Sequence, residues 1–188
     1  MQLYALCDQT TLTKKNYTLE AFVELCNRHD AEIIQYRNKS GDLDFITEQL
    51  MTLRALWSKT LIINDAFSLH SFCDGVHLGQ EDLYKVDRDP ATALKKIRTA
   101  IGKKKLIGLS THNKEEIDLA NTLDLDYIGL GAYRATNTKE DAAPLKEQLD
   151  ALAAGSKHPV AAIGGVRFDD EFEYVRYRVI SSALYGED

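Results

Sequence analysis

Cysteine is scarce in this chain of 188 residues. The three cysteines, Cys7, Cys26 and Cys73, are widely spaced and form no CxxC pair. An odd number of widely spaced cysteines disfavours both a disulfide framework and a zinc site. We therefore expect the three side chains to be small residues of the core.

Long apolar runs are also lacking, which disfavours a membrane-spanning segment. No stretch approaches the roughly 20 apolar residues that a spanning helix needs. The first residues, Met1 to Tyr4, lead directly into a strand-like run with no basic segment before it, which is not typical of a signal peptide. We expect a cytoplasmic protein with no membrane partner.

Positive charge is not concentrated anywhere in the chain. The formal net charge is −6, and the basic cluster Lys103, Lys104 and Lys105 is only three residues long. It lies between a predicted helix and a predicted strand, where a solvent-exposed turn explains it. We therefore expect no nucleic-acid partner.

Two hydrophobic periods alternate along the whole chain. With 44% hydrophobic residues, the length suits one sizeable core, and we expect a single domain over residues 1–188. Short runs typical of strands occur at residues 3–8, 32–38, 60–65, 75–79, 106–111, 127–132, 159–165 and 178–185. Stretches with helical periodicity occur at residues 18–29, 44–57, 89–102, 113–123 and 144–156.

This alternation predicts an α/β fold with a parallel sheet and helical crossovers. Eight strands, several of them continuously apolar, favour closure into a (β/α)8 TIM barrel. An open, doubly wound sheet is the alternative, although the segment CDQTTLT after the first strand lacks the GxGxxG pattern of a dinucleotide fold. Residues 168–177 leave room only for a shortened seventh helix, and the chain ends too soon for an eighth.

Polar residues follow every predicted strand. Active sites of such barrels lie at the C-terminal ends of the strands, so these residues are candidates for function. Cations at Arg37 and Lys139, several hydroxyls, and the free amides of a Gly-Gly pair suit an anionic, phosphate-bearing substrate. Asp65 and Asp82 follow neighbouring strands, which suits a shared Mg²⁺ ion that also binds substrate phosphates.

The successive motifs resemble those of the thiamine phosphate synthase family. They are QYRNK at 35–39, IIND at 62–65, DGVHLGQEDL at 74–83, IGLSTH at 107–112, DYIGLGAYRATNTK at 126–139 and VAAIGGV at 160–166. They occur in the family's order and cover nearly the whole chain. The resemblance implies a TIM-barrel transferase that joins 4-amino-2-methyl-5-hydroxymethylpyrimidine diphosphate to a thiazole phosphate, releasing pyrophosphate and forming thiamine phosphate.

The resemblance also implies roles for individual residues. Asp65 and Asp82 would bind Mg²⁺, and Arg37, Lys39, Ser110 and Lys139 would be catalytic. Both substrates would be bound by a larger set that includes these four: Gln35, Tyr36, Arg37, Asn38, Lys39, Asn64, Ser110, Thr136, Asn137, Thr138, Lys139, Gly165, Ser181 and Ser182. Within it, Thr136, Thr138, Gly165, Ser181 and Ser182 would face the thiazole phosphate.

The chemistry of that reaction agrees with these residue types. Breaking the bond to diphosphate leaves negative charge on the leaving group and positive charge on a methylene carbon, so the site must stabilise an anion and exclude water. Simpler interpretations remain open at this stage. Arg37 and Lys39 could be solvated, Asp65 could cap a helix, and His77 could be a core residue.

Two other functions also remain open. His112 could be catalytic, as a histidine in this motif of the related thiazole tautomerases is, and such an enzyme would work without Mg²⁺. The short C-terminal end and the departures Arg134 and Ala135, where the family has an aromatic residue and a proline, would suit a non-catalytic binding paralogue.

The short end also predicts a homodimer. Without an eighth helix, strands near both chain ends would be uncovered, and the nearby Phe172, Tyr174, Tyr177 and Tyr185 would form an apolar patch. We expect two-fold pairing over this gap. The alternative is that the chain's own N-terminal residues or a short helix at FDDEFEYV cover it.

Overall fold

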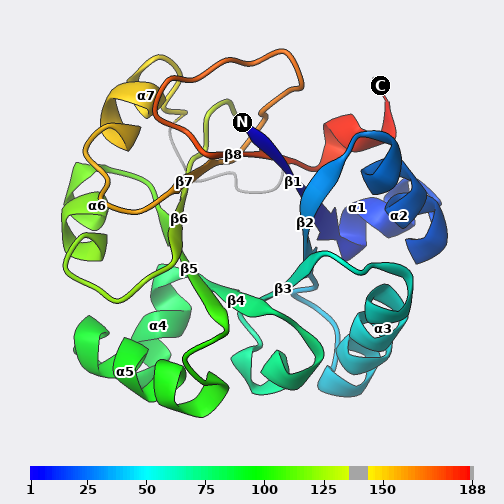
Figure 1. The fold of residues 1–188 in the computed structure, drawn as a ribbon, viewed down its shortest axis with the longest axis horizontal. Coiled ribbons are helices and arrows are strands. Elements are labelled where there is room, and N and C mark those ends of the chain that lie inside the picture. The colour runs from blue at the N-terminus through cyan, green and yellow to red at the C-terminus, as the bar shows by residue number, and fades with distance from the viewer. Residues whose placement is uncertain (136–143, 187–188) are drawn as a thin grey trace.

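The computed structural model describes residues 1–135 and 144–186 and forms a closed barrel of eight parallel strands (Figure 1). The strands follow one another in sequence order around the barrel, which confirms the TIM-barrel prediction over the open sheet. They are β1 (Gln2–Asp8), β2 (Ala31–Arg37), β3 (Thr60–Asn64), β4 (Gly75–Leu78), β5 (Leu106–Thr111), β6 (Tyr127–Leu130), β7 (Val160–Ala162) and β8 (Tyr177–Ile180).

Helices surround the barrel on its outer side, as Figure 1 shows. The α-helices are α1 (Gln9–Lys14), α2 (Leu19–Arg28), α3 (Leu43–Leu56), α4 (Gln80–Val86), α5 (Pro90–Ile101), α6 (Lys114–Ala120) and α7 (Gln148–Ala153). Two 3₁₀ helices, η1 (Phe67–Phe72) and η2 (Ser182–Tyr185), complete the described chain. No helix in residues 1–135 or 144–186 combines the length and the apolar character that crossing a membrane requires.

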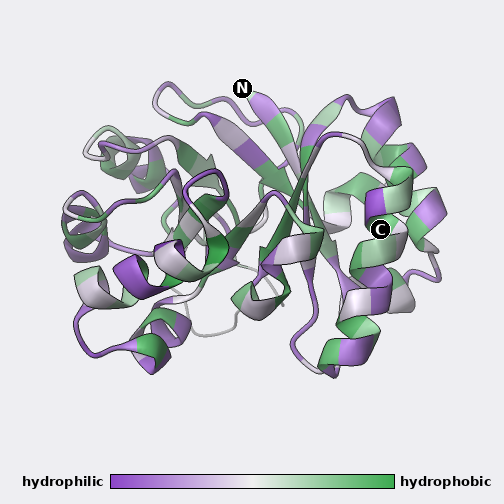
Figure 2. Ribbon diagram, turned by 60° about the horizontal axis from the view of Figure 1, so that its bottom comes forward, coloured by the Kyte–Doolittle hydropathy of each residue, from purple (hydrophilic) through white to green (hydrophobic). Residues whose placement is uncertain are grey.

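The core has two layers because successive strand residues point to opposite faces of the sheet. The larger layer lies between the strands and the helices and contains all three cysteines, which are buried and free as predicted. The smaller layer fills the barrel interior with Tyr4, Leu6, Ile33, Ile62, Tyr127, Ala161 and Val179. Figure 2 shows that many strand residues are hydrophobic, whereas the surrounding helices carry both hydrophilic and hydrophobic residues.

Glycine ends the seventh strand earlier than the sequence pattern predicts. The predicted strand at 159–165 is limited to Val160–Ala162. Gly164 and Gly165 have φ angles of 90° and 65°, in the left-handed region that L side chains rarely adopt, so the chain turns there.

The C-terminal prediction of a long strand at 178–185 is wrong. The strand β8 stops at Ile180, and the apolar residues after it form η2 instead. Residues 163–176 contain no helix, so the short helix expected at FDDEFEYV is also absent. Within the described residues no α-helix follows β8, and η2 is the last element there.

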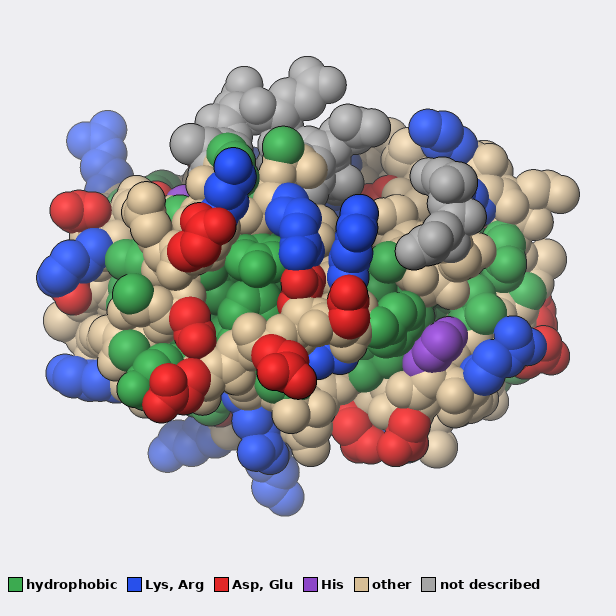
Figure 3. All heavy atoms as spheres, turned by 90° about the horizontal axis from the view of Figure 1, so that it is seen from above, with side chains coloured by type: hydrophobic (Ala, Val, Ile, Leu, Met, Phe, Trp, Pro, Cys, Tyr) green, Lys and Arg blue, Asp and Glu red, His purple; other side chains and the backbone are tan. Residues whose placement is uncertain are grey.

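The uncovered apolar patch expected at this end does not form. Tyr185 lies against Tyr17, with 4.8 Å between ring centroids, and η2 packs on α2 (Figure 1). Phe172 packs edge-on against Tyr133 at 5.0 Å, whereas Tyr174 is 51% exposed. Figure 3 views the molecule from the top of Figure 1, the side on which β8 lies. On this face, charged side chains separate the apolar ones. The chain's own residues cover this end, and the homodimer stays a prediction.

Candidate active site

Polar side chains from several neighbouring strands meet at the C-terminal mouth of the barrel. Asp65 follows β3, and its backbone N–H donates to the carbonyl oxygen of His77 on β4 at 2.8 Å. Its Oδ1 accepts a hydrogen bond from the N–H of Gly79 at 3.1 Å. A Cβ atom on Gly79 would lie 3.0 Å from Asp82 Oδ2 and 3.9 Å from Asp65 Oδ1. The two carboxylates predicted to bind Mg²⁺ therefore approach each other across Gly79.

The electrostatics of Asp65 reflect this approach. Burial and then the neighbouring charge of Asp82 raise the pKa of Asp65, while Lys39 acts in the opposite direction. The backbone of Asp65 has a φ of 62°, which is uncommon for a residue other than glycine and is often found at functional sites. Lys85 partly neutralises the pair through its 2.7 Å contact with Asp82 Oδ1.

The interpretation of Asp65 as a helix cap does not fit the structure. The following helix η1 is preceded by Ala66 and has no side-chain capping bond. The Asp65 side chain is instead bonded to Gly79 and to Asn64, whose Nδ2 donates to Asp65 Oδ2 at 2.5 Å.

The carboxylate oxygens of Asp65 and Asp82 are the kind of ligand that Mg²⁺ prefers. Mg²⁺ is bound by one or two carboxylates together with substrate phosphates and water, rather than by a cage made only of protein ligands. Asp65 and Asp82 supply two carboxylates, and the described residues contain no group of three or more metal-binding side chains. The pair could therefore hold a cation that shares its coordination sphere with a phosphate group.

Arg37 lies at the end of β2, where Asp8 of β1 holds its guanidinium. The two residues are paired in the strand register, and Arg37 Nη1 donates to Asp8 Oδ2. Asp8 is 3% exposed and also caps α1 through Thr11. Arg37 is therefore a positioned side chain and not a freely solvated one. No role was predicted for Asp8, although its alternation with the inward-facing Tyr4 and Leu6 indicates this position.

The other residues after β2 have different surroundings. Lys39 is exposed and lies close enough to affect the pKa of Asp65. Asn38 turns the chain, because its Oδ1 accepts bonds from the N–H groups of Ser40 and Gly41 at 3.1 and 2.9 Å.

Tyr36 does not join the predicted substrate-binding cluster. It is fully buried between the barrel and the helices and donates from its hydroxyl to Gln9 Oε1 at 2.8 Å. Its neighbour Gln35 points inward and donates from Nε2 to Asn64 Oδ1 at 2.8 Å, so β2 contributes its odd-numbered residues to the mouth.

Ser110 on β5 is half-buried and lies beside His77. Its Oγ is 3.0 Å from His77 Nε2. Its carbonyl oxygen accepts a 2.7 Å bond from Gln80 Nε2. Ser110 lies at a strand end as predicted, whereas its contact with Gln80 was not predicted.

His112 follows the same strand and forms a pair with Glu116 of α6. His112 Nδ1 lies 2.8 Å from Glu116 Oε2, which also accepts from the His112 backbone N–H at 2.9 Å. Both side chains are 28% exposed.

The predicted thiazole phosphate side is only partly described. Thr136, Asn137, Thr138 and Lys139 lie outside the described residues. Gly165 is in the turn after β7, while Ser181 and Ser182 follow β8. Arg134 donates to the carbonyl oxygen of Gly165 at 2.6 Å and forms two 2.6 Å bonds with Asp170. Arg134, which stands at a position where this sequence departs from the family pattern, therefore holds the Gly164–Gly165 turn in place.

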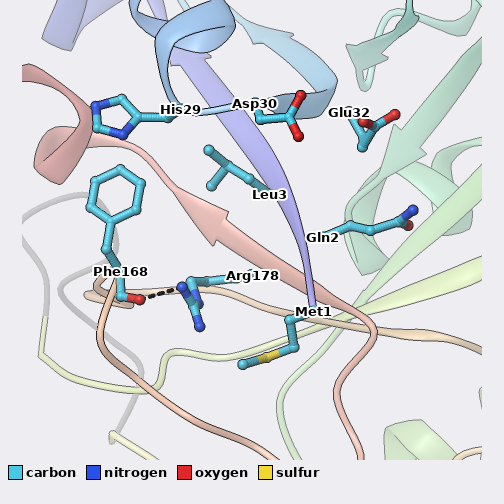
Figure 4. A pocket seen from close by; sticks show the side chains of 8 residues that line it. All are labelled: Met1, Gln2, Leu3, His29, Asp30, Glu32, Phe168 and Arg178. Atoms are coloured by element: carbon cyan, nitrogen blue, oxygen red, sulfur yellow. Dashed lines mark hydrogen bonds between the residues drawn. The ribbon is translucent and has the colours of Figure 1, made fainter.

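A cavity of about 300 Å³ lies at the opposite end of the strands. It is lined by Met1, Gln2, Leu3, His29, Asp30, Glu32, Phe168 and Arg178, and Figure 4 shows the rings of His29 and Phe168 facing each other. Its β1, β2 and β8 residues lie near the N-terminal ends of their strands, away from the polar cluster described above.

Residues 3–184 match the thiamine monophosphate synthase family. The chain belongs to this family. It is 33% identical over 192 residues to a thiamine-phosphate synthase of Lawsonia intracellularis, covering 98% of this chain and 83% of the relative. A thiamine-phosphate synthase of Persephonella marina is 35% identical over 172 residues, covering 88% of this chain and 77% of the relative.

A solved structure supports the same assignment, and a second one shares the fold. The thiamine phosphate pyrophosphorylase of Pyrococcus furiosus has a TM-score of 0.77 and 26% identity, covering all of this chain and 88% of its own. The tryptophan synthase α subunit of Legionella pneumophila has a TM-score of 0.60 at 13% identity, covering 99% of this chain and 82% of its own. That second likeness shows the barrel fold alone.

Proposed function

We propose that this protein is a magnesium-dependent thiamine phosphate synthase. It would join 4-amino-2-methyl-5-hydroxymethylpyrimidine diphosphate to a thiazole phosphate in thiamine biosynthesis. The observation that carries the proposal is the approach of Asp65 and Asp82 across Gly79, at the mouth of a barrel of this family.

The reaction explains why the mouth combines acids with cations. The C–O bond between the pyrimidine methylene and diphosphate breaks, and its electron pair leaves with the diphosphate. The thiazole nitrogen then supplies the electron pair of the new C–N bond. No proton has to be removed from a carbon atom, so the residues must chiefly bind, orient and stabilise charge.

The residues at the mouth divide these tasks. Arg37, held by Asp8, presents a fixed guanidinium to the diphosphate, and the exposed Lys39 adds a second positive charge. Asp65 and Asp82 would hold Mg²⁺, which when bound would neutralise charge on the diphosphate. Asn64 orients Asp65 through the 2.5 Å bond to its Oδ2.

The thiazole phosphate would bind on the other side of the mouth. The Gly164 and Gly165 turn follows β7, in the part of a barrel that often binds phosphate. Arg134 and Asp170 fix this turn from outside. Lys139, Thr136, Asn137 and Thr138 complete the proposed site from the segment outside the described residues.

Turnover tests the proposal most directly. The protein, both substrates and Mg²⁺ should yield thiamine phosphate and pyrophosphate in equal amounts. Binding of both substrates without turnover would instead indicate a non-catalytic paralogue.

A thiazole tautomerase is the second candidate, because His112 is paired with Glu116. Such an enzyme would need no Mg²⁺. A His112→Gln variant that loses isomerisation of a thiazole phosphate, in a protein without synthase turnover, would favour it.

Four further expectations stay predictions: a cytoplasmic location, a single domain over residues 1–188, and the lack of nucleic-acid and of membrane partners.

A further inference from the structure

The cavity at the N-terminal ends of the strands lies on the outer side of β1 and β8. Tyr4 and Val179 point into the barrel, so their neighbours Leu3 and Arg178, which line the cavity, point outward. Within the described residues no α-helix follows β8. The 3₁₀ helix η2 packs near the start of α2, whereas the cavity lies beyond the end of α2, where His29 lines it. This part of the outer face is therefore open to a ligand.

Charged side chains of opposite sign line two sides of the cavity. In the strand register, Leu3 of β1 is paired with Ala31 of β2 on one side and with Arg178 of β8 on the other. The backbones of β2 and β8 are thus two strand spacings apart, about 10 Å. Figure 4 shows Asp30 and Glu32 on one side of Leu3 and Arg178 on the other. A ligand that contacts both sides needs a positive group at one end and a negative group at the other.

The two acids can bind a positive group in addition to Lys59. Lys59 Nζ lies 3.4 Å from Asp30 Oδ1 and 3.1 Å from Glu32 Oε1. A carboxylate has two oxygens and about four lone-pair sites, so each acid can accept from a second cation. Lys59 and Arg178 together balance the formal charge of the two acids, which favours a ligand without net charge.

Arg178 is held by the segment between β7 and β8 and has a donor that lacks a partner. Its Nη1 donates to the carbonyl oxygen of Phe168, and its Nη2 donates to that of Asp170 at 2.7 Å. Its Nε is buried and has no hydrogen-bond partner among the described residues. Such a group calls for an explanation, and a carboxylate is the acceptor whose geometry matches a guanidinium best.

The cavity between these charged sides is lined by apolar and aromatic groups. The rings of His29 and Phe168 are stacked, with 4.5 Å between their centroids, and Leu3 and Met1 complete this lining. An apolar lining with a few placed polar groups is typical of small-molecule sites, whose volumes begin at about 300 Å³. The ligand therefore has an apolar or aromatic middle between its two charged ends.

We propose that this cavity binds a small zwitterion, with its ammonium group at Asp30 and Glu32 and its carboxylate at Arg178. Aminocarboxylates whose two charges are separated by an apolar chain or ring have this chemistry. The site is distinct from the proposed active site, which lies at the opposite ends of the strands.

A ligand in the cavity would act on the Gly164–Gly165 turn through a chain of hydrogen bonds. Arg178 binds the backbone of Asp170, and the Asp170 carboxylate binds Arg134 through two 2.6 Å bonds. Arg134 in turn donates to the carbonyl oxygen of Gly165 at 2.6 Å. Such a contiguous network can couple two sites. An effect on the thiazole phosphate rests on the proposed function, whereas the cavity site does not.

Titration calorimetry with three probes that share one benzene ring tests the two charged ends. 4-(Aminomethyl)benzoate carries both charges, benzylamine only the ammonium group and benzoate only the carboxylate. We expect the zwitterion to bind at least about tenfold more tightly than either half, since each end adds a charged contact. Equal affinity for the zwitterion and one of its halves, or no binding of the zwitterion at millimolar concentration, would overturn the proposal.

The double variant Asp30→Asn, Glu32→Gln tests the ammonium side. Affinity for the zwitterion should fall by about tenfold, the effect of two partly exposed ion pairs, while affinity for benzoate should not fall. The matched control, Asp44→Asn with Glu48→Gln, removes two exposed acids of α3 and should change neither affinity. An unchanged affinity for the zwitterion in the first variant would contradict the placement of its ammonium group.

Backbone ¹H–¹⁵N spectra locate the zwitterion and follow its effect on the turn. We expect the amide signals of Leu3, Glu32 and Phe168 to move during the titration, and that of Gly165 to move with the same midpoint. In Arg134→Ala the first three signals should still move, and that of Gly165 should not. Shifts confined to the mouth of the barrel would exclude the cavity as the site. A Gly165 signal that is unaffected in the wild type, or still moves in Arg134→Ala, would contradict the coupling.

The cavity site and the proposed function fail in different experiments. Calorimetry and spectra use no substrate of the synthase reaction, so a negative result there leaves the proposed function standing. A lack of turnover leaves the zwitterion site standing in the same way.

Discussion

Asp82 contributes negative charge beside Asp65, and its substitution would separate the proposed binding of Mg²⁺ from the stability of the fold. Asp82→Asn removes one carboxylate of the proposed Mg²⁺ pair at nearly constant size. We expect a loss of magnesium-dependent turnover greater than the roughly 10- to 100-fold typical of residues behind a metal ligand. Stability without metal should stay the same or rise, because Asp82 is one cause of the raised pKa of Asp65.

Magnesium titration calorimetry and thermal unfolding without metal measure these two effects. The control is Glu81→Gln, which changes an exposed acid one residue away. If Asp82→Asn kept full activity with no added divalent ion, the metal assignment would be wrong.

Arg37 should not be replaceable by lysine. A guanidinium can bind Asp8 through one nitrogen and a diphosphate through the others, whereas an ammonium group lacks this planar fork. Arg37→Lys should therefore lose at least about tenfold in kcat/KM, the effect of one charged hydrogen bond. Steady-state kinetics measure this loss, with a substitution of an exposed arginine, Arg88→Lys, as the control. Equally small losses in the two variants would mean that Arg37 is a solvated side chain with no special role.

At the scale of the elements, the segment between β7 and β8 contains no helix and is held in place by an ion pair. Asp170 binds Arg134 through two 2.6 Å bonds and also accepts from the Arg167 N–H at 2.7 Å. The hydrogen bond with Arg134 lowers the pKa of Asp170. The pair therefore stabilises the fold above the unfolded-state pKa of about 3.9, and this contribution is lost as the pH falls through the lower folded-state pKa.

Asp170→Asn should reduce the free energy of unfolding by roughly 1 kcal/mol at pH 7, because Arg134 is partly exposed and solvent screens the pair. The difference from the wild type should shrink as the pH falls below about 4. Urea unfolding at several pH values measures this, with the exposed neighbour Asp169→Asn as control. A difference that is independent of pH would exclude the charge as its source.

The barrel could be predicted from sequence because its signals are local. Each strand is a short apolar run, and each carries polar residues at its C-terminal end, so position alone predicted that Asp65, Asp82 and Ser110 lie at the mouth of the barrel. The resemblance grouped Tyr36 with Gln35 and Arg37, but Tyr36 points outward, into the layer between the strands and the helices.

The remaining features depend on contacts between distant segments. Asp8 acts through Arg37, 29 residues away, and His77 on β4 contacts Tyr127 of β6 and Ser110 of β5. The segment after Ile180 has the apolar pattern of a strand, but it forms η2 because Tyr185 packs on Tyr17 and Phe22. The local sequence pattern does not predict contacts between residues so far apart in the chain.

At the scale of the whole molecule, the oligomeric state is open to direct measurement. The chain has a mass of 21.1 kDa, so the predicted two-fold dimer should show about twice this mass by light scattering at micromolar concentration. The internal packing of Tyr185 and Phe172 removes the apolar gap that motivated this prediction. A mass near 21 kDa would contradict the dimer and leave the catalytic proposal unchanged.

The central claim is that this barrel forms thiamine phosphate in a reaction that needs Mg²⁺. The most direct measurement mixes the purified protein with the pyrimidine diphosphate and the thiazole phosphate, with and without Mg²⁺, and quantifies both products. We expect thiamine phosphate and pyrophosphate in a 1:1 ratio with Mg²⁺ and almost none after chelation. No thiamine phosphate from a folded protein that binds both substrates, or equal formation without a divalent ion, would contradict the account.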